Sequence, residues 1–308
     1  MSEFLPLGEW VDRGVKLLIE NDAGSLQDFG AAIEGLTALL EAGLLALPIW
    51  LVAAAFVLTG LWRVGWKFAL FCVACCAVIA GTGFWPQTMV TLALISAATL
   101  LSLLLGLPLG LWMAKSDRVA AVVRPTLDFM QTMPAFVYLI PAAMLFGLGR
   151  VPGVLATVIF AMPPVVRLTS LGIRQVNKEQ VEAGITFGCT PLQLLFKVEI
   201  PGALPSIMAG VNQTIMMALS MVIIASMVGA GGLGNDVLAS IQRLDIGLGF
   251  ESGLAVVLLA IMLDRITETF GSQGPRRSLR ERLGLRGRAS QGHDKGHGSS
   301  ENRSSATP

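Results

Sequence analysis

The sequence predicts an all-α protein that crosses a membrane about seven times. One observation is its composition, because 54% of the 308 residues are hydrophobic and only 14% are charged, whereas soluble domains carry about 25% charged residues. The other is the length of its apolar runs, since no charged residue occurs between Phe68 and Ala114. At about 20 residues per crossing, that run alone holds two helical spans.

The expected spans are bounded by charged residues and by clusters of Gly and Pro. The longest apolar run is divided at residues 81–87, and two short spans farther along are separated by Arg150 and Pro152. Gly106 and Gly110 lie four residues apart in one span, a spacing that lets two helices approach closely. In chain order, the spans are residues 44–62, the two halves of 68–114, and residues 134–149, 151–166, 207–229 and 253–270.

Segments of different composition flank the spans and give three expected regions. Residues 1–43 are acidic and amphipathic and lack the basic start of a signal peptide, so we expect a retained extracytoplasmic segment. Residues 44–270 form the transmembrane domain, with a long interior loop at about 167–205. Residues 271–308 are rich in Gly, Ser and Arg and cannot bury enough apolar surface to fold. We expect a disordered basic cytoplasmic tail whose arginines at 276–288 meet anionic lipid headgroups.

The placement of Lys and Arg sets the expected orientation, because cytoplasmic loops carry an excess of basic residues. With the N-terminus outside, only Arg13, Lys16, Arg150 and Arg243 lie outside. We therefore expect a multi-pass protein of the bacterial cell (inner) membrane, in contact with lipid, with its N-terminus outside and its C-terminus in the cytoplasm. The inner loops then hold Arg63, Lys67, Lys115, Arg118, Arg124, Arg167, Arg174, Lys178 and Lys197.

The long interior loop is expected to form two short helices. Asn177 can cap the first helix, and Gly188 suits its left-handed end. Thr190 can cap a second helix that begins at Pro191 and must stop before Pro201. The result is a compact helical elbow, residues 177–200, which either covers the inner ends of the spans or docks a partner.

Short motifs in this loop resemble a known family. The run Glu182-Ala183-Gly184 is followed by Gly188 and by prolines at 201 and 205, and this series resembles the EAA loop of ABC importer permeases. In that family the loop forms a coupling helix that sits in a groove of the ATP-binding subunit. Gly184 departs from the pattern, because the family name implies a second Ala there. The resemblance assigns ATPase coupling to Glu182, Ala183, Gly184, Thr186, Phe187, Gly188, Cys189 and Pro201.

Residues 124–138, 208–214 and 218–227 resemble the permease subunit of glycine betaine and proline betaine importers, and the similarity extends over about residues 44–270. This resemblance implies the type I ABC importer permease fold. It also implies transport of glycine betaine, proline betaine or related quaternary ammonium osmoprotectants by alternating access. The implied partners are two copies of an ABC ATPase subunit, an extracytoplasmic substrate-binding protein and a second copy of this chain, which would form a homodimer.

The glycine-rich motifs do not indicate nucleotide binding by this chain. No G-x-x-x-x-G-K-[ST] sequence occurs, so ATP hydrolysis must belong to a partner. Residues 229–234 match G-x-G-x-x-G, but they follow a membrane helix where a dinucleotide site needs a strand. We expect a flexible loop at the outer mouth. We also expect no cofactor on this chain, with ATP and Mg²⁺ on the ATPase, and no nucleic-acid partner.

Candidate substrate contacts follow from the chemistry of betaines. A quaternary ammonium group cannot donate hydrogen bonds and is best held over aromatic faces. Phe136 and the only tyrosine, Tyr138, offer aromatic surface, while Asn212, Gln213 and Thr214 offer polar groups. Ordinary packing is the alternative explanation for each of these residues.

Two other functions remain open. A permease of the same architecture for choline, carnitine, ectoine or an amino acid would share these features, because specificity resides largely in the binding protein. A membrane-embedded enzyme would keep ionisable groups at membrane depth, where the spans carry only Asp264 and Arg265 near an inner edge. Cys72, Cys75 and Cys76 have no nearby ligand partners and are expected to pack as apolar residues. We therefore expect a transport subunit without catalytic or metal-binding residues.

Overall fold

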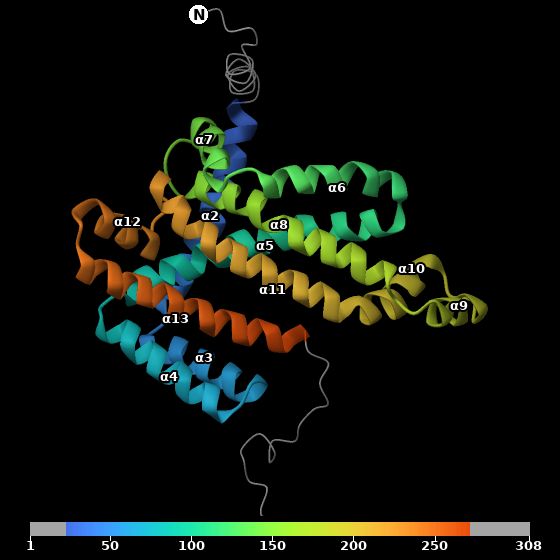
Figure 1. The fold of residues 1–308 in the computed structure, drawn as a ribbon, viewed down its shortest axis with the longest axis horizontal. Helices are drawn as coiled ribbons and strands as arrows, with labels where there is room; N and C mark the ends of the chain where they lie inside the picture. The colour runs from blue at the N-terminus through green and yellow to red at the C-terminus, as the bar shows by residue number, and fades with distance from the viewer. Residues whose placement is uncertain (1–22, 272–308) are drawn as a thin grey trace, which may run out of the picture. The chain divides into compact units, whose positions relative to one another are not determined.

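The structure, a computed structural model, describes residues 23–271, and within this range the chain is helical and forms no strand. The predicted all-α class is confirmed. Figure 1 shows long helices lying side by side, with shorter helices at their ends. In chain order the elements are α2 (Ala23–Ala46), α3 (Ile49–Arg63), α4 (Trp66–Gly81), α5 (Trp85–Lys115), α6 (Asp117–Thr132), α7 (Ala135–Phe146), α8 (Arg150–Arg174), α9 (Lys178–Thr186), α10 (Pro191–Leu194), the π-helical turn η1 (Leu195–Glu199), α11 (Ile200–Ala225), the 3₁₀ turn η2 (Ser226–Val228), α12 (Leu233–Arg243) and α13 (Ile246–Gly271).

The predicted count of about seven spans is too high for the described residues. Five helices in this range are long and apolar enough to cross a membrane, and a sixth candidate is the pair α6 and α7, which meet at a bend of 97°. Helices α3 and α4 have only 15 and 16 residues, fewer than the roughly 20 that a crossing needs. The five helices are Gly24–Ala46, Trp85–Lys115, Arg150–Arg174, Pro191–Val228 and Ile246–Thr269.

The N-terminal boundary also differs from the prediction. The expected first span, 44–62, is broken at Pro48, whose backbone is extended at the start of α3, and the boundary at residue 44 falls inside α2. Figure 1 shows α2 running across the direction of α5, α8 and α11. A membrane normal along those three helices would place α2 closer to the membrane plane, so its extracytoplasmic position stays a prediction. Residues 1–22 and the basic tail after Gly271 lie outside the described residues.

The two short spans expected at 134–149 and 151–166 are unequal in the structure. The first corresponds to α7, which has only 12 residues and joins α6 at the bend. The second is the first part of α8, which continues past Pro163 and Pro164 to Arg174 and has 25 residues. Arg167 and Arg174 therefore lie on this helix and not in the expected loop. They place basic side chains in roughly the last two turns of α8.

The core of the bundle is α8, packed against α5 on one side and α11 on the other. A Cβ at Gly106 on α5 would lie 2.6 Å from Val165 Cγ1, and one at Gly210 on α11 would lie 3.0 Å from Val165 Cα. A Cβ at Gly110 would lie 2.9 Å from the Val166 carbonyl oxygen. The predicted close approach at Gly106 and Gly110 is confirmed, and glycine on both neighbours lets three backbones meet around a fully buried Val165.

We expect Gly110→Ala to destabilise the protein. The added methyl group would meet the α8 backbone, which cannot move as a flexible side chain can, and overpacking of this kind costs about 1–3 kcal/mol. Thermal unfolding of the detergent-purified protein would measure the loss. Gly253→Ala on α13 is the matched control, because a Cβ there meets no atom within 4 Å. Equal melting temperatures for the two variants would contradict the close-packing interpretation.

Candidate functional site

The elbow is built by local caps that match the sequence. The Asn177 side chain accepts a hydrogen bond from the Glu179 N–H at 2.9 Å, and Gly188 has φ +80°, in the left-handed region. Thr190 and Gln193 form a reciprocal capping box, with N···O distances of 3.3 and 2.9 Å. The caps expected at Asn177, Gly188 and Thr190 are confirmed. Figure 1 places α9 and α10 at one end of the long helices.

Gly184 holds the two short helices together. A Cβ at this position would lie 2.7 Å from Leu194 Cδ1 of α10, and both residues are buried. The absence of a side chain therefore lets α9 and α10 close on each other. The departure from Ala that the sequence shows at this position has a packing reason in the structure.

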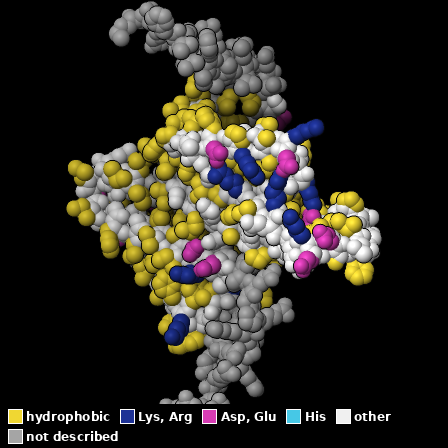
Figure 2. Space-filling model, turned by 45° about the vertical axis from the view of Figure 1, so that its right-hand side comes forward, with side chains coloured by type: hydrophobic (Ala, Val, Ile, Leu, Met, Phe, Trp, Pro, Cys, Tyr) yellow, Lys and Arg dark blue, Asp and Glu magenta, His cyan; other side chains and the backbone are white. Residues whose placement is uncertain are grey.

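The outer face of the elbow exposes an apolar patch, which consists of Ile185, Phe187, Leu192 and Phe196 and is called the elbow patch below. Phe187 has 88% of its surface exposed. Figure 2 shows apolar and acidic side chains side by side on this projecting part. Large exposed apolar patches mark sites of protein–protein or membrane interaction. Of the residues expected to couple to an ATPase, Gly184 is buried, Cys189 is half-buried, and the exposed ones are Glu182, Ala183, Thr186, Phe187, Gly188 and Pro201.

The end of the second elbow helix differs from the prediction. This helix was expected to stop before Pro201, but α10 continues through η1 directly into α11. The Ile200 N–H donates to the Leu195 carbonyl oxygen, five residues back. Pro201 follows this wider π-helical turn and lies in the first turn of α11. The elbow is therefore joined to α11 by continuous helix.

One ion pair fastens the base of the elbow to α5, and a second pair near it joins α8 to α6. Glu199, with only 6% of its surface exposed, receives Lys115 of α5 at 2.5 and 2.7 Å. Arg174 of α8 contacts Asp117 at 2.8 Å and donates to the Met113 carbonyl oxygen at 2.9 Å. Sequence reasoning missed Glu199. The sequence does carry a signal for this ion pair, because Glu199 directly precedes one apolar helix and Lys115 ends another. Motion of the elbow is thereby coupled to α5 and α11.

The five expected substrate contacts are not brought together. Phe136 is exposed on α7, and the Tyr138 hydroxyl donates to the Met130 carbonyl oxygen at 2.8 Å. Asn212 joins α11 to α13, because its amide donates to Asp264 at 3.0 Å and its oxygen accepts from Thr267. None of the five lines either of the two cavities described below. Gln213 and Thr214, the other two of the five, differ in exposure, since Gln213 is exposed and Thr214 is fully buried.

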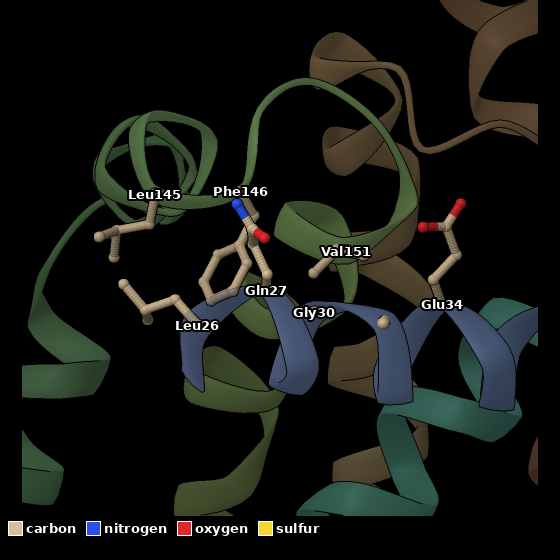
Figure 3. A pocket seen from close by; sticks show the side chains of 8 residues that line it. Leu26, Gln27, Gly30, Glu34, Leu145, Phe146 and Val151 are labelled. Atoms are coloured by element: carbon tan, nitrogen blue, oxygen red, sulfur yellow. The ribbon is translucent and has the colours of Figure 1, made fainter. Parts of the chain in front are cut away.

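A cavity of about 380 Å³ lies between α2 and the α7–α8 turn, at the end of α8 opposite the elbow. Figure 3 shows Phe146 lying over Gly30 of α2, beside Gln27 and Val151. Arg150 pairs with Glu41 of α2 at 2.7 Å. These contacts fasten α2 to this end of the bundle.

The loop expected to be flexible, residues 229–234, is packed against the bundle. The Leu233 N–H donates to the Thr91 hydroxyl oxygen at 2.8 Å, and Leu233 itself is fully buried. A Cβ at Gly232 would lie 3.1 Å from the Thr91 backbone nitrogen. The glycines therefore serve close approach to α5. Cys72, Cys75 and Cys76 are buried in the apolar core, as expected of packing residues.

The packed helices and the elbow fall within a known protein family. Residues 106–271 match the family described as binding-protein-dependent transport system inner membrane component. The chain belongs to this family. It is thus a permease, the multi-pass inner-membrane subunit of an importer whose ATP hydrolysis takes place on a separate subunit, and its partners are an ATPase and a substrate-binding protein.

Two relatives cover nearly all of this permease. The glycine betaine/proline betaine transport system permease protein ProW of Escherichia coli K12 is 46% identical over 278 residues, which are 89% of this chain and 78% of that protein. The glycine betaine/carnitine transport permease protein GbuB of Listeria monocytogenes serotype 1/2a is 47% identical over 273 residues, 87% of this chain and 96% of that protein. The predicted resemblance is confirmed.

A solved structure confirms the type I ABC importer permease fold. The methionine ABC transporter MetNI, in an inward-facing conformation, aligns with a TM-score of 0.52 over 58% of this permease and 92% of that chain. The sequence identity is 20%, so the similarity concerns the fold alone.

We expect Glu199→Gln to destabilise this permease by about 1–3 kcal/mol, because it removes one partner of a largely buried charged contact. A double-mutant cycle with Lys115→Gln, measured by thermal unfolding, should give a combined effect smaller than the sum of the two single effects. Glu268→Gln is the control, since its pair with Arg265 is exposed on both sides and is worth about 0.5 kcal/mol or less. Strict additivity in the cycle would show that the two residues do not interact.

Proposed function

We propose that this permease carries glycine betaine, proline betaine or a related quaternary ammonium osmoprotectant into the cell. The observation that supports this substrate class is the 46–47% identity over nearly the whole chain to ProW and GbuB. Both are named as glycine betaine permeases, the first also for proline betaine and the second also for carnitine. The substrate is delivered by an extracytoplasmic binding protein, which sets much of the specificity.

The working complex contains two copies of the permease and two ATPase subunits. Each chain has one elbow, and two motors each need one. The elbow end faces the cytoplasm and the N-terminus lies outside, because the basic side chains of α6 and α8 gather beside the elbow (Figure 2) and inner loops are basic. The chain itself binds no cofactor, and ATP and Mg²⁺ sit on the ATPase.

Coupling is mechanical in this proposal. The elbow patch docks into the ATPase, and closure of the two motors on ATP moves the elbow. The Gly184–Leu194 contact keeps its two helices together, the continuous turn through η1 passes the motion to α11, and Lys115–Glu199 passes it to α5. The tightly packed helices then move as units between inward-open and outward-open states.

The pathway needs few contacts, because a betaine has no net charge. Phe136 is exposed and offers an aromatic face to a quaternary ammonium group. Gln213 of α11 offers an exposed hydrogen-bonding side chain. Asn212 and Thr214 become available only if α11 shifts relative to its neighbours. Tyr138 contributes its ring, since its hydroxyl is already bonded to Met130.

The substrate is tested by ATP-dependent uptake of radiolabelled glycine betaine into proteoliposomes that contain the permease, its ATPase and its binding protein. We expect saturable uptake that is competed by unlabelled proline betaine and carnitine. Methionine is the control competitor and should have no effect. Absence of betaine uptake, with uptake of another small solute such as choline or ectoine, would refute the proposed substrate class but support the importer function.

Docking of the elbow is tested with Phe187→Asp, which places a charge at the centre of the elbow patch. We expect loss of ATPase co-purification and at least a tenfold drop in uptake, because a buried interface aromatic typically contributes 2 kcal/mol or more. Leu148→Asp is the matched control, since Leu148 has 81% of its surface exposed but lies before α8, at the other end of the bundle. Normal co-purification of Phe187→Asp would refute docking through this patch.

A further inference from the structure

A second cavity, of about 300 Å³, lies at the elbow end of the bundle between α6 and α8. Three arginines line it, Arg124 of α6 and Arg167 and Arg174 of α8, together with Asp128 and Leu171. Neither ATPase docking nor the proposed transport path uses this cavity. Figure 2 shows the basic side chains gathered on this face of the molecule.

The cavity carries a net positive charge, since its lining holds three guanidinium groups and one carboxylate, and among the described residues only one further carboxylate, Asp117, pairs with these arginines. Arg167 pairs with Asp128 at 2.5 Å, and Arg174 pairs with Asp117 at 2.8 Å. Both carboxylates are exposed, so water screens these pairs and they are weak. Arg124 is exposed and forms no ion pair with any residue between 23 and 271. Guanidinium donors therefore remain for a ligand, and their planar fork matches phosphate oxygens.

The surroundings of the cavity indicate an amphiphile and not a free anion. Met113 lines it, and the preceding residue, Trp112, has 64% of its surface exposed near the end of α5. Exposed indole rings of membrane proteins sit at the depth of the lipid headgroups. Leu171 within the lining is 46% exposed, and Phe129 on α6 is exposed beside Asp128. The basic cavity thus includes two apolar side chains in its lining, Met113 and the partly exposed Leu171, and exposed aromatic rings occur elsewhere on α5 and α6.

We propose that this cavity binds the phosphate headgroup of an anionic phospholipid of the cytoplasmic leaflet. The phosphate oxygens accept hydrogen bonds from Arg124 and from the guanidinium groups of Arg167 and Arg174, while the acyl chains follow the apolar side chains beside the opening. The lipid then bridges α6 and α8 at the end where the elbow is attached.

The test measures lipid retention by the purified permease–ATPase complex. The complex is titrated in detergent with phosphatidylglycerol or phosphatidylcholine, and bound lipid is counted by native mass spectrometry. We expect phosphatidylglycerol to bind more tightly than phosphatidylcholine. Arg124→Gln should weaken phosphatidylglycerol binding about fivefold, the value of one basic residue at an anionic membrane surface. Arg124→Lys, which keeps the charge, should recover part of the affinity.

The control is Arg118→Gln, an exposed arginine of the same helix that does not line the cavity, and it should bind phosphatidylglycerol as the unmodified protein does. Inorganic phosphate, added at the ionic strength of a chloride control, should displace no more lipid than chloride does. Equal losses in Arg124→Gln and Arg118→Gln, or equal binding of the two lipids, would overturn the proposal. Specific displacement by inorganic phosphate would identify a site for soluble anions instead.

Discussion

The close approach of three backbones around Val165 is the constraint on which the rest of this permease depends. Lipid tails are as apolar as leucine side chains, so the helices gain little from leaving lipid and must gain from van der Waals contact with each other. Glycine at 106, 110 and 210 provides that contact, because α8 can then lie directly against the backbones of α5 and α11. A bundle packed in this way resists bending within each helix and favours motion of whole helices.

The polar contacts at the two ends of the bundle have different consequences. At the elbow end, Lys115–Glu199 joins α5 to η1, directly before α11. Arg174 of α8 pairs with Asp117 of α6 and donates to the Met113 carbonyl oxygen of α5. A force on the elbow is therefore passed first to α5 and α11. At the other end, Arg150–Glu41 holds α2 against the start of α8.

Sequence reasoning found features that depend on neighbouring residues and missed those that depend on tertiary contacts. The caps at Asn177, Gly188 and Thr190 are set within a few residues, and the apolar runs of α5, α11 and α13 exceed the length of a crossing. The break at Pro48 and the left-handed turn at Gly65 cut the early apolar region into pieces too short to span. Helix α2 was missed as an apolar helix because Glu34 and Glu41 interrupt it, and the partner of Glu41 lies 109 residues away. The Gly184–Leu194 and Lys115–Glu199 contacts likewise join positions that no local pattern connects.

The uninterrupted passage from α10 through η1 into α11 fixes the rotational phase of the elbow relative to the bundle. Inserting or deleting one residue between Phe196 and Pro201 would turn the elbow patch by about 100° around the axis of α11, away from any partner that met it before. Chimeras that exchange elbows between permeases should accordingly carry α9, α10 and η1 as one unit, so that the Gly184–Leu194 contact and the helical phase relative to α11 are both kept.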